Sequence, residues 1–286
     1  MKIRFYLLTG VVLLLCHDLH AQIVQPARTR DFACRKPVDS VSVEVAYSCR
    51  IRRILDPESY SSDLQILEIG KKYSRYFSSY AEQADSLYTN FRKYANFGKD
   101  RNGYFREGTY EDIYINYPES GQISVVNRYV SKNFIYEEKR PELKWEILSD
   151  TENILGYECF KASAHFRGRT WYAWFTMDIP LNYGPWKLCG LPGLILKAED
   201  ADRYFTYEAV GIRQNLSRPM MMYDEAAQKC KRSEILVFND LRWKDGNFLL
   251  KMMSGQEVLV AYPDNIRNSI RNDVPQEKVI PQRELE

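Results

Sequence analysis

The most constraining feature of the sequence is a strict alternation of residue types over residues 41–51. The larger apolar side chains, from Val41 to Ile51, occupy the odd positions, while Ser42, Glu44 and Ser48 stand at even ones. Successive side chains of a strand point to opposite faces of the sheet, so this alternation predicts a β-strand. The chain also holds 21 Tyr, 13 Phe and 5 Trp, and aromatic side chains favour pleated surfaces.

Further strand-like segments follow one another through short turns. Hairpins are predicted over 64–79, 110–136, 157–177 and 194–212, with further strands beginning near Trp145 and lying within 248–262. Apolar residues at helical spacing predict helices over 80–97 and 223–241. Short connections favour antiparallel pairing, so the predicted fold is mainly β: an antiparallel curved sheet or an incomplete β-barrel of the lipoprotein-carrier type, with one or two accessory helices.

The first 21 residues are typical of a secretory signal peptide. Lys2 and Arg4 precede an apolar run from Phe5 to Leu15, and Ala21 supplies a small residue before the cleavage point. The run is shorter than the roughly 20 residues that a membrane-spanning helix needs. The chain is therefore predicted to be exported, to the periplasm or to the outer membrane; lipidation at Cys16 is the alternative that would anchor it.

The rest of the chain is predicted to divide simply. Residues 22–40 are expected to form a flexible leader, 41–262 a single β-rich domain, and 263–286 an extended tail. The formal net charge is +2, from 40 Lys and Arg against 38 Asp and Glu. This balance lacks the positive excess of a nucleic-acid-binding domain, and we expect neither a nucleic-acid partner nor a cofactor.

His165 is the one histidine that remains once residues 1–21 are removed, which excludes a His-rich metal site. Any Ser-His-Asp or Cys-His catalysis would have to use this residue. Within residues 157–166, however, His165 shares a strand face with Lys161 and Ser163, opposite Phe160 and Phe166. The pattern favours a solvent-facing strand histidine over a catalytic one, and no catalytic residue is predicted.

Five cysteines follow the signal segment, so at least one thiol is left unpaired in any set of disulfides. An oxidising compartment permits bridges, and Cys34–Cys49 and Cys159–Cys189 are the candidate pairs. The alternative for each pair is small buried thiols in the core. No C-x-x-C spacing is present.

The segment Gly190-Leu191-Pro192-Gly193-Leu194-Ile195 is the most distinctive motif of the chain. Pro192 and Gly193 predict a type II turn, in which the glycine supplies a positive φ. The strand that begins at Leu194 is apolar on both faces and is expected to be buried on both.

This hexapeptide resembles the motif for which the GLPGLI family is named. Further matching segments lie upstream: Gly156–Ala162, Phe166–Arg169, Ala173–Thr176, Asp178–Pro180 and Gly184–Trp186. The resemblance is dense over about 145–212 and looser elsewhere. It implies a secreted protein of Gram-negative bacteria, often encoded near outer-membrane TonB-dependent receptors, with no established activity and no catalytic residues to carry over.

Three function classes follow from these observations. The first is a non-catalytic binding or carrier module for a peptide or an apolar ligand, in which aromatic residues near the motif would supply contact area. The candidate residues are Trp171, Trp174, Tyr183 and Trp186. The alternative is that these rings form the core. The second class is an accessory protein that docks on an outer-membrane receptor.

The third class is a hydrolase built on carboxylates. Asp178, Glu199, Asp200 and Asp202 could pair as acid and base, or bind calcium. The segment 200–203 is more simply explained as a hairpin turn.

Overall fold

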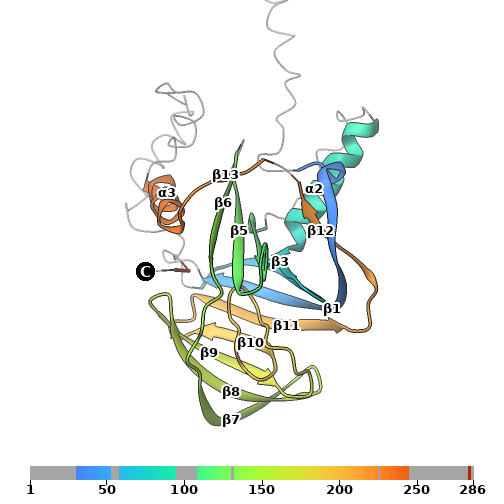
Figure 1. Cartoon of the computed structure of the whole chain (residues 1–286). Coiled ribbons are helices and arrows are strands. Elements are labelled where there is room, and N and C mark those ends of the chain that lie inside the picture. The colour runs from blue at the N-terminus through green and yellow to red at the C-terminus, as the bar shows by residue number, and fades with distance from the viewer. Residues whose placement is uncertain are drawn as a thin grey trace, which may run out of the picture.

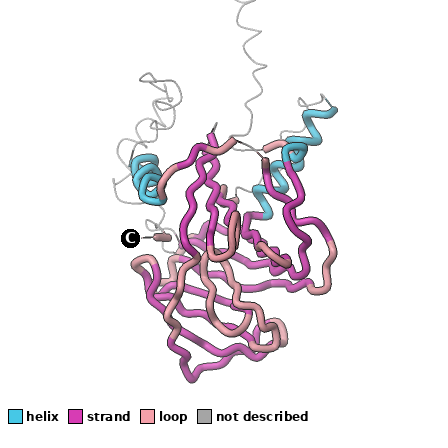
Figure 2. Tube along the Cα trace, in the orientation of Figure 1, coloured by secondary structure: helices cyan, strands magenta, loops and turns pink. Residues whose placement is uncertain are grey.

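A computed structural model describes residues 30–52, 58–94, 108–129, 132–224, 226–244 and 283–284. These residues form one curved sheet of thirteen strands that is open and not closed into a barrel (Figure 1). Two α-helices accompany the sheet within the described ranges (Figure 2). The predicted mainly β class, with a curved sheet and one or two accessory helices, is confirmed.

The strands of the first half are β1 (Arg35–Arg52), β2 (Tyr60–Gly70), β3 (Ser74–Ser78), β4 (Glu111–Ile115), β5 (Gln122–Tyr129) and β6 (Lys132–Lys139). The second half holds β7 (Glu146–Ile154), β8 (Tyr157–Phe166), β9 (Arg169–Thr176), β10 (Leu194–Asp200), β11 (Phe205–Arg213), β12 (Arg218–Tyr223) and β13 (Gln228–Lys229). The helices are the 3-10 turn η2 (Phe32–Cys34), α2 (Ser79–Tyr94) and α3 (Arg232–Lys244).

Strand β1 joins the two halves of the sheet. It pairs with β2 on one side and with β11 on the other, and its first residues also pair with β12. The strand order is β13-β6-β5-β4-β3-β2-β1-β11-β10-β9-β8-β7. Every pair is antiparallel except the short β13–β6 pair, so the prediction of antiparallel pairing holds for nearly the whole sheet.

The two faces of the sheet differ in what covers them. On the face that we call the core face, apolar side chains from both halves pack together; they include Val45, Tyr47, Leu67, Ile113, Val125, Trp171 and Tyr207. The opposite face of β2–β6, which we call the helix face, is covered by α2, η2 and the segment that contains β12. In Figure 1, α2 and β12 lie on the same side of the β1–β6 half.

Helix α2 forms where its periodicity predicted, but its buried side is more polar than expected. Ser78 caps the first turn by accepting a hydrogen bond from the amide of Ala81. Leu87, expected in the apolar stripe, is 44% exposed, whereas Asp85 is fully buried. The helix is oriented in this way because Asp85 pairs with Arg128 on the helix face of the sheet, as described below.

The other predicted elements agree with the structure, with three differences. Residues 122–136 form parts of two strands, β5 and β6, and not one. The helix predicted over 223–241 begins only at Arg232, after β12 and β13. The leader predicted over 22–40 is in part structured, because residues 35–40 pair with β12. The signal segment, the strand of 248–262 and most of the 263–286 tail lie outside the described residues.

Gly193 serves a different purpose from the one predicted. Gly190 has a positive φ of 93°, but Gly193 is not among the positive-φ residues, so the predicted type II turn is wrong. A Cβ atom on Gly193 would lie 1.9 Å from the carbonyl oxygen of Thr176. Glycine is required here because two backbone segments approach closely. Leu194 and Ile195 are fully buried, as expected for this strand.

No helix among the described residues is both long and apolar enough to cross a bilayer.

Candidate functional site

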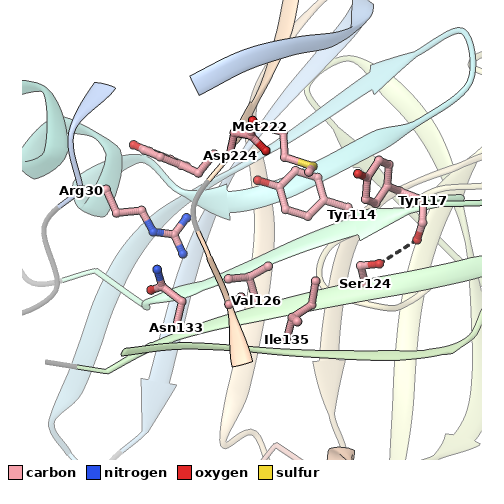
Figure 3. A pocket seen from close by; sticks show the side chains of 11 residues that line it. Arg30, Tyr114, Tyr117, Ser124, Val126, Asn133, Ile135, Met222 and Asp224 are labelled. Carbon is pink, nitrogen blue, oxygen red and sulfur yellow. Dashed lines mark hydrogen bonds between the residues drawn. The ribbon is translucent and has the colours of Figure 1, made fainter. Parts of the chain in front are cut away.

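A small pocket opens on the helix face, between strands β4–β6 and the segment that links β12 to β13 (Figure 3). Its lining residues come from three separate parts of the chain: Arg30, Tyr114, Tyr117, Ser124, Val126, Asn133, Ile135, Met222, Tyr223, Asp224 and Ala227. The segment reaches across the sheet because β12 pairs with β1 whereas β13 pairs with β6. This crossing segment closes one side of the pocket.

Strand register explains why the strand residues meet. Tyr114 on β4 stands opposite Ser124 on β5, and Val126 on β5 stands opposite Ile135 on β6. Directly paired residues share a face of the sheet. Figure 3 shows Val126 and Ile135 along the strands, with Tyr114 and Tyr117 toward one end and Arg30 and Asn133 toward the other.

Beside the pocket lies a buried ionic cluster of Arg30, Arg128, Asp85 and Asp112. Arg30 donates to Asp112 at 3.0 Å, and its backbone amide donates to Asp85 at 2.8 Å. Arg128 bridges the two carboxylates, at 2.7 Å from Asp85 and 3.3 Å from Asp112. All four side chains are nearly inaccessible to solvent. Separating these side chains would leave a buried charge without its partner, which is costly. The cluster therefore holds the pocket wall in place.

The pKa values of the two carboxyl groups are shifted in opposite directions. Burial alone would raise the pKa of Asp112, but the guanidinium groups of Arg128 and Arg30 outweigh it and hold the pKa at about 2. Burial raises the pKa of Asp85, and Arg128 offsets this only in part. The hydroxyl of Tyr223 donates to Asp85 at 2.6 Å, which connects the crossing segment to the ionic cluster.

Tyr114 contributes a polar atom to the pocket whose hydrogen-bonding capacity is unused. Its side chain is 2% exposed, and its hydroxyl has no hydrogen-bond partner among the described residues. Buried polar atoms are nearly always paired with protein or water. Burial raises the pKa of this hydroxyl to about 12, so it is a neutral donor at physiological pH. Ser124, by contrast, already donates to the Tyr117 carbonyl at 2.9 Å.

The size of the pocket decides what it can hold. Its volume is about 90 Å³, whereas sites for drug-sized ligands span roughly 300–1,000 Å³. The pocket therefore suits one substituent of a larger ligand, held between tyrosine rings, apolar side chains and a few polar groups.

The four aromatic residues predicted as a binding surface lie elsewhere. Trp171, Trp174 and Trp186 are at most 7% exposed. Trp171 packs on Trp186 with ring centroids 5.5 Å apart, inside the core. Tyr183 is half-buried and accepts a hydrogen bond from Asn116. The three tryptophans are core residues, which was the alternative to a binding surface. None of the four residues lines the pocket.

Of the four predicted carboxylates, Asp178 lies apart from Glu199, Asp200 and Asp202, which share the end of β10 and the following turn. Asp200 is 1% exposed, pairs with Arg169 at 2.8 Å and accepts from the Phe205 amide at 2.7 Å, so it stabilises the hairpin turn. Asp178 is exposed and follows β9, whose last residues pair with the first residues of β10. Asp200 ends β10, so roughly 20 Å of strand separates the two carboxylates.

All five described cysteines are free thiols, so neither Cys34–Cys49 nor Cys159–Cys189 is bridged. Cys34 immediately precedes β1, and Cys49 lies near the other end of that strand. Strand residues advance about 3.3 Å each, whereas a disulfide needs Cα atoms within roughly 7 Å. His165 is exposed on β8, as its strand position predicted. Among the described residues, no group of three or more His, Cys, Asp or Glu could hold a metal ion.

Sequence reasoning missed the pocket altogether. The alternation of 110–117 and 122–136 places Tyr114, Ser124 and Val126 on strand faces, and this signal was available. Nothing in the local sequence, however, indicates that Arg30 and Met222 contact those strands.

Comparison with known proteins gives one family match. A family model described as "N-glycanase peptide, N-terminal domain" matches residues 107–240. Two solved structures of PNGF-II, in the P21 and C2 space groups, are each similar at 16% identity and a TM-score of 0.48. Each covers 71% of this chain, which spans 33% of the length of those structures. No curated protein matches the sequence.

The family match corrects two predictions. The resemblance to the GLPGLI family is wrong, because the matching model is that of an N-glycanase N-terminal domain. The prediction of a non-catalytic envelope carrier, with receptor docking as its alternative, is wrong for the same reason: residues 107–240 are similar to the N-terminal domain of an N-glycanase.

Proposed function

We propose that this chain recognises N-glycans attached to peptides and takes part in their hydrolysis, as an N-glycanase-like protein. The observation that carries the proposal is the position of the pocket. Ten of its eleven lining residues, all except Arg30, fall within residues 107–240, the range that matches the N-glycanase domain. The matched stretch thus includes the part of the chain that builds a cavity.

The chemistry of the lining suits a sugar substituent. Tyrosine rings offer an apolar face together with a polar hydroxyl, and sugar rings present C–H faces beside hydroxyl and amide groups. Tyr114 and Tyr117 lie with ring centroids 6.0 Å apart and form such a wall. The unpartnered hydroxyl of Tyr114 can donate to one oxygen of the substituent. A volume of about 90 Å³ fits a group such as an acetamido substituent, with the rest of the glycan outside.

The signal-like pattern of residues 1–21 motivates the proposal that the chain meets its glycopeptide after export. Mass analysis of the mature protein from its native source would reveal whether Ala21 precedes the first residue.

Binding is tested by titrating the full chain with a peptide that carries one N-glycan and with the same peptide lacking it. We expect binding of the glycopeptide alone. Tyr114→Phe removes only the hydroxyl, and a lost hydrogen bond of about 0.5–1.5 kcal/mol weakens binding roughly two- to twelve-fold. Tyr207→Phe is the matched control, because Tyr207 carries a buried, unpartnered hydroxyl on the core face.

Hydrolysis is tested in the same mixture by mass spectrometry of released glycan. Glycan-dependent binding together with release supports the proposal. Binding without release would overturn the hydrolytic part, and equal binding of both peptides would overturn the whole.

A further inference from the structure

A second charged site lies on the core face, around Lys187 in the loop between β9 and β10. Lys187 is 1% exposed. Its ammonium group lies 2.7 Å from Glu138 on β6, donates to the Tyr136 hydroxyl at 2.9 Å, and lies 2.5 Å from Glu284. A buried lysine needs compensating charge, and here part of that charge comes from a residue far along the chain.

Glu284 is held by three cations from three different elements. Besides Lys187, Arg232 of α3 lies 2.5 Å away, and Arg167 of the β8–β9 turn lies 3.9 Å away. The side chain of Glu284 is 8% exposed. Burial alone would raise the pKa of Glu284, but Lys187, Arg232 and Arg167 together outweigh it and the pKa is lowered. Residues 283–284 form the short dark red segment beneath α3 in Figure 1.

The charges show that this position requires an anion. Apart from Glu284, the same three cations share the carboxylate of Glu138, at 2.7 Å from Lys187, 2.6 Å from Arg167 and 3.8 Å from Arg232. Without Glu284, all three cations would lose one of the two carboxylates that they share, and the Lys187 side chain is fully buried. Because removing a partner from a buried charge is costly, the geometry forms a receptor for a second carboxylate.

Arg283, the residue before Glu284, is bound at a separate position formed by two aromatic rings and a carboxylate. Its guanidinium group lies over the rings of Trp186 and Phe205, at 5.4 and 5.6 Å from their centroids, and 3.6 Å from Glu111. Aromatic faces attract cations. The core face therefore binds a basic residue followed by an acidic one, each at a separate position.

We propose that Lys187, Arg167 and Arg232 form a carboxylate-binding site for an Arg-Glu peptide segment, which the chain's own Glu284 occupies as an internal ligand. The site is independent of the pocket and of the glycan-related function, because it lies on the opposite face of the sheet. Displacement of the internal segment would free the carboxylate-binding site to bind an Arg-Glu segment of a separate peptide.

The test uses the full chain with Arg283→Ala and Glu284→Ala together, which removes the internal ligand. A fluorescent peptide spanning Val279–Glu286 is titrated, and its anisotropy is measured. We expect the double variant to bind this peptide at least ten-fold more tightly than the unaltered chain does. A peptide with Gln in place of Glu284 should lose at least ten-fold of that affinity.

Further substitutions in the double variant identify the receptor. Lys187→Met is expected to abolish peptide binding, and Arg232→Met, at a less buried position, tests the same site if Lys187→Met fails to fold. Lys161→Met is the matched control, because Lys161 pairs with exposed Asp150 far from Glu284 in the fold. Peptide binding that is equal in the unaltered chain and a folded double variant would overturn the proposal, as would equal binding of the Gln peptide.

Discussion

The hydroxyl of Tyr223 donates a hydrogen bond of 2.6 Å to Asp85, 138 residues earlier in the chain. This bond connects β12, whose last residues line the pocket, to α2, which covers the helix face. Arg128 contacts the same carboxylate oxygen of Asp85 at 2.7 Å and extends the network to Asp112. The pocket wall therefore depends on the buried ionic cluster as much as on strand pairing.

Replacing Asp112 with Asn is expected to lower the free energy of unfolding by about 3–5 kcal/mol. The substitution keeps the shape of the side chain but leaves Arg30 and Arg128 with one carboxylate fewer in a dry site. Urea unfolding followed by tryptophan fluorescence measures the change. Asp150→Asn is the control, since the exposed Asp150–Lys161 pair should contribute less than about 1 kcal/mol. Equal effects of the two variants would contradict the role of the cluster.

The contribution of Asp112 should depend on pH in a defined window. Its folded pKa of about 2 lies below its ordinary value of 3.8, so its stabilisation is present above pH 3.8 and is lost as pH falls toward 2. The gap in unfolding free energy between the unaltered chain and Asp112→Asn should stay constant from pH 7 to 5 and shrink below pH 4. Unfolding curves at a series of pH values measure this gap. A gap that is still complete at pH 2.5 would count against a carboxylate lowered by its arginine neighbours.

Gly193→Ala is expected to destabilise the chain by about 3 kcal/mol or more. The added Cβ would meet the Thr176 carbonyl at 1.9 Å, and backbone atoms of paired strands cannot move aside easily. Gly211→Ala is the control, because a Cβ at Gly211 meets no atom within 4 Å. Thermal unfolding of both variants should separate them clearly. A mild effect at Gly193 would mean that the β9–β10 junction is looser than the structure indicates.

Thiol labelling should distinguish the cysteines by their surroundings. Cys34 is exposed, whereas Cys49 is buried and burial raises its pKa to about 12. A maleimide should therefore modify Cys34 in the native chain and Cys49 only after unfolding, since the thiolate is the reactive form. Mass spectrometry before and after denaturation without reductant counts the labels. Failure of both residues to react in the denatured chain would indicate a bridge between them.

The fold class could be predicted because strand periodicity is a local property. The alternation in 41–51 reappears as the later part of β1, and the pair 157–166 and 170–177 reappears as β8 and β9, joined by a turn in which Arg167 and Gly168 both have positive φ. Boundaries were less reliable where two elements adjoin. The segment 122–136 has one continuous pattern but turns between β5 and β6, and α3 begins later than its pattern suggested.

The aromatic residues show the limit of composition as a guide to function. Trp171 and Trp186 stood near a conspicuous motif, yet they pack in the core because the β9–β10 loop folds back over the sheet. Gly193 was correctly singled out but for the wrong reason. Adjacent residues are enough to predict a turn type. The close approach of the Gly193 backbone to Thr176 depends instead on where the neighbouring strand lies.

The sequence by itself determined that the chain is mainly β, where most strands lie, and that His165 faces solvent, because side-chain alternation acts over a few residues. Tertiary structure alone decided that Arg30, Tyr114 and Met222 share a pocket and that Lys187 receives Glu284. These sites join segments that are far apart in the chain, and their positions follow from strand order and buried charge pairing, which no local pattern encodes.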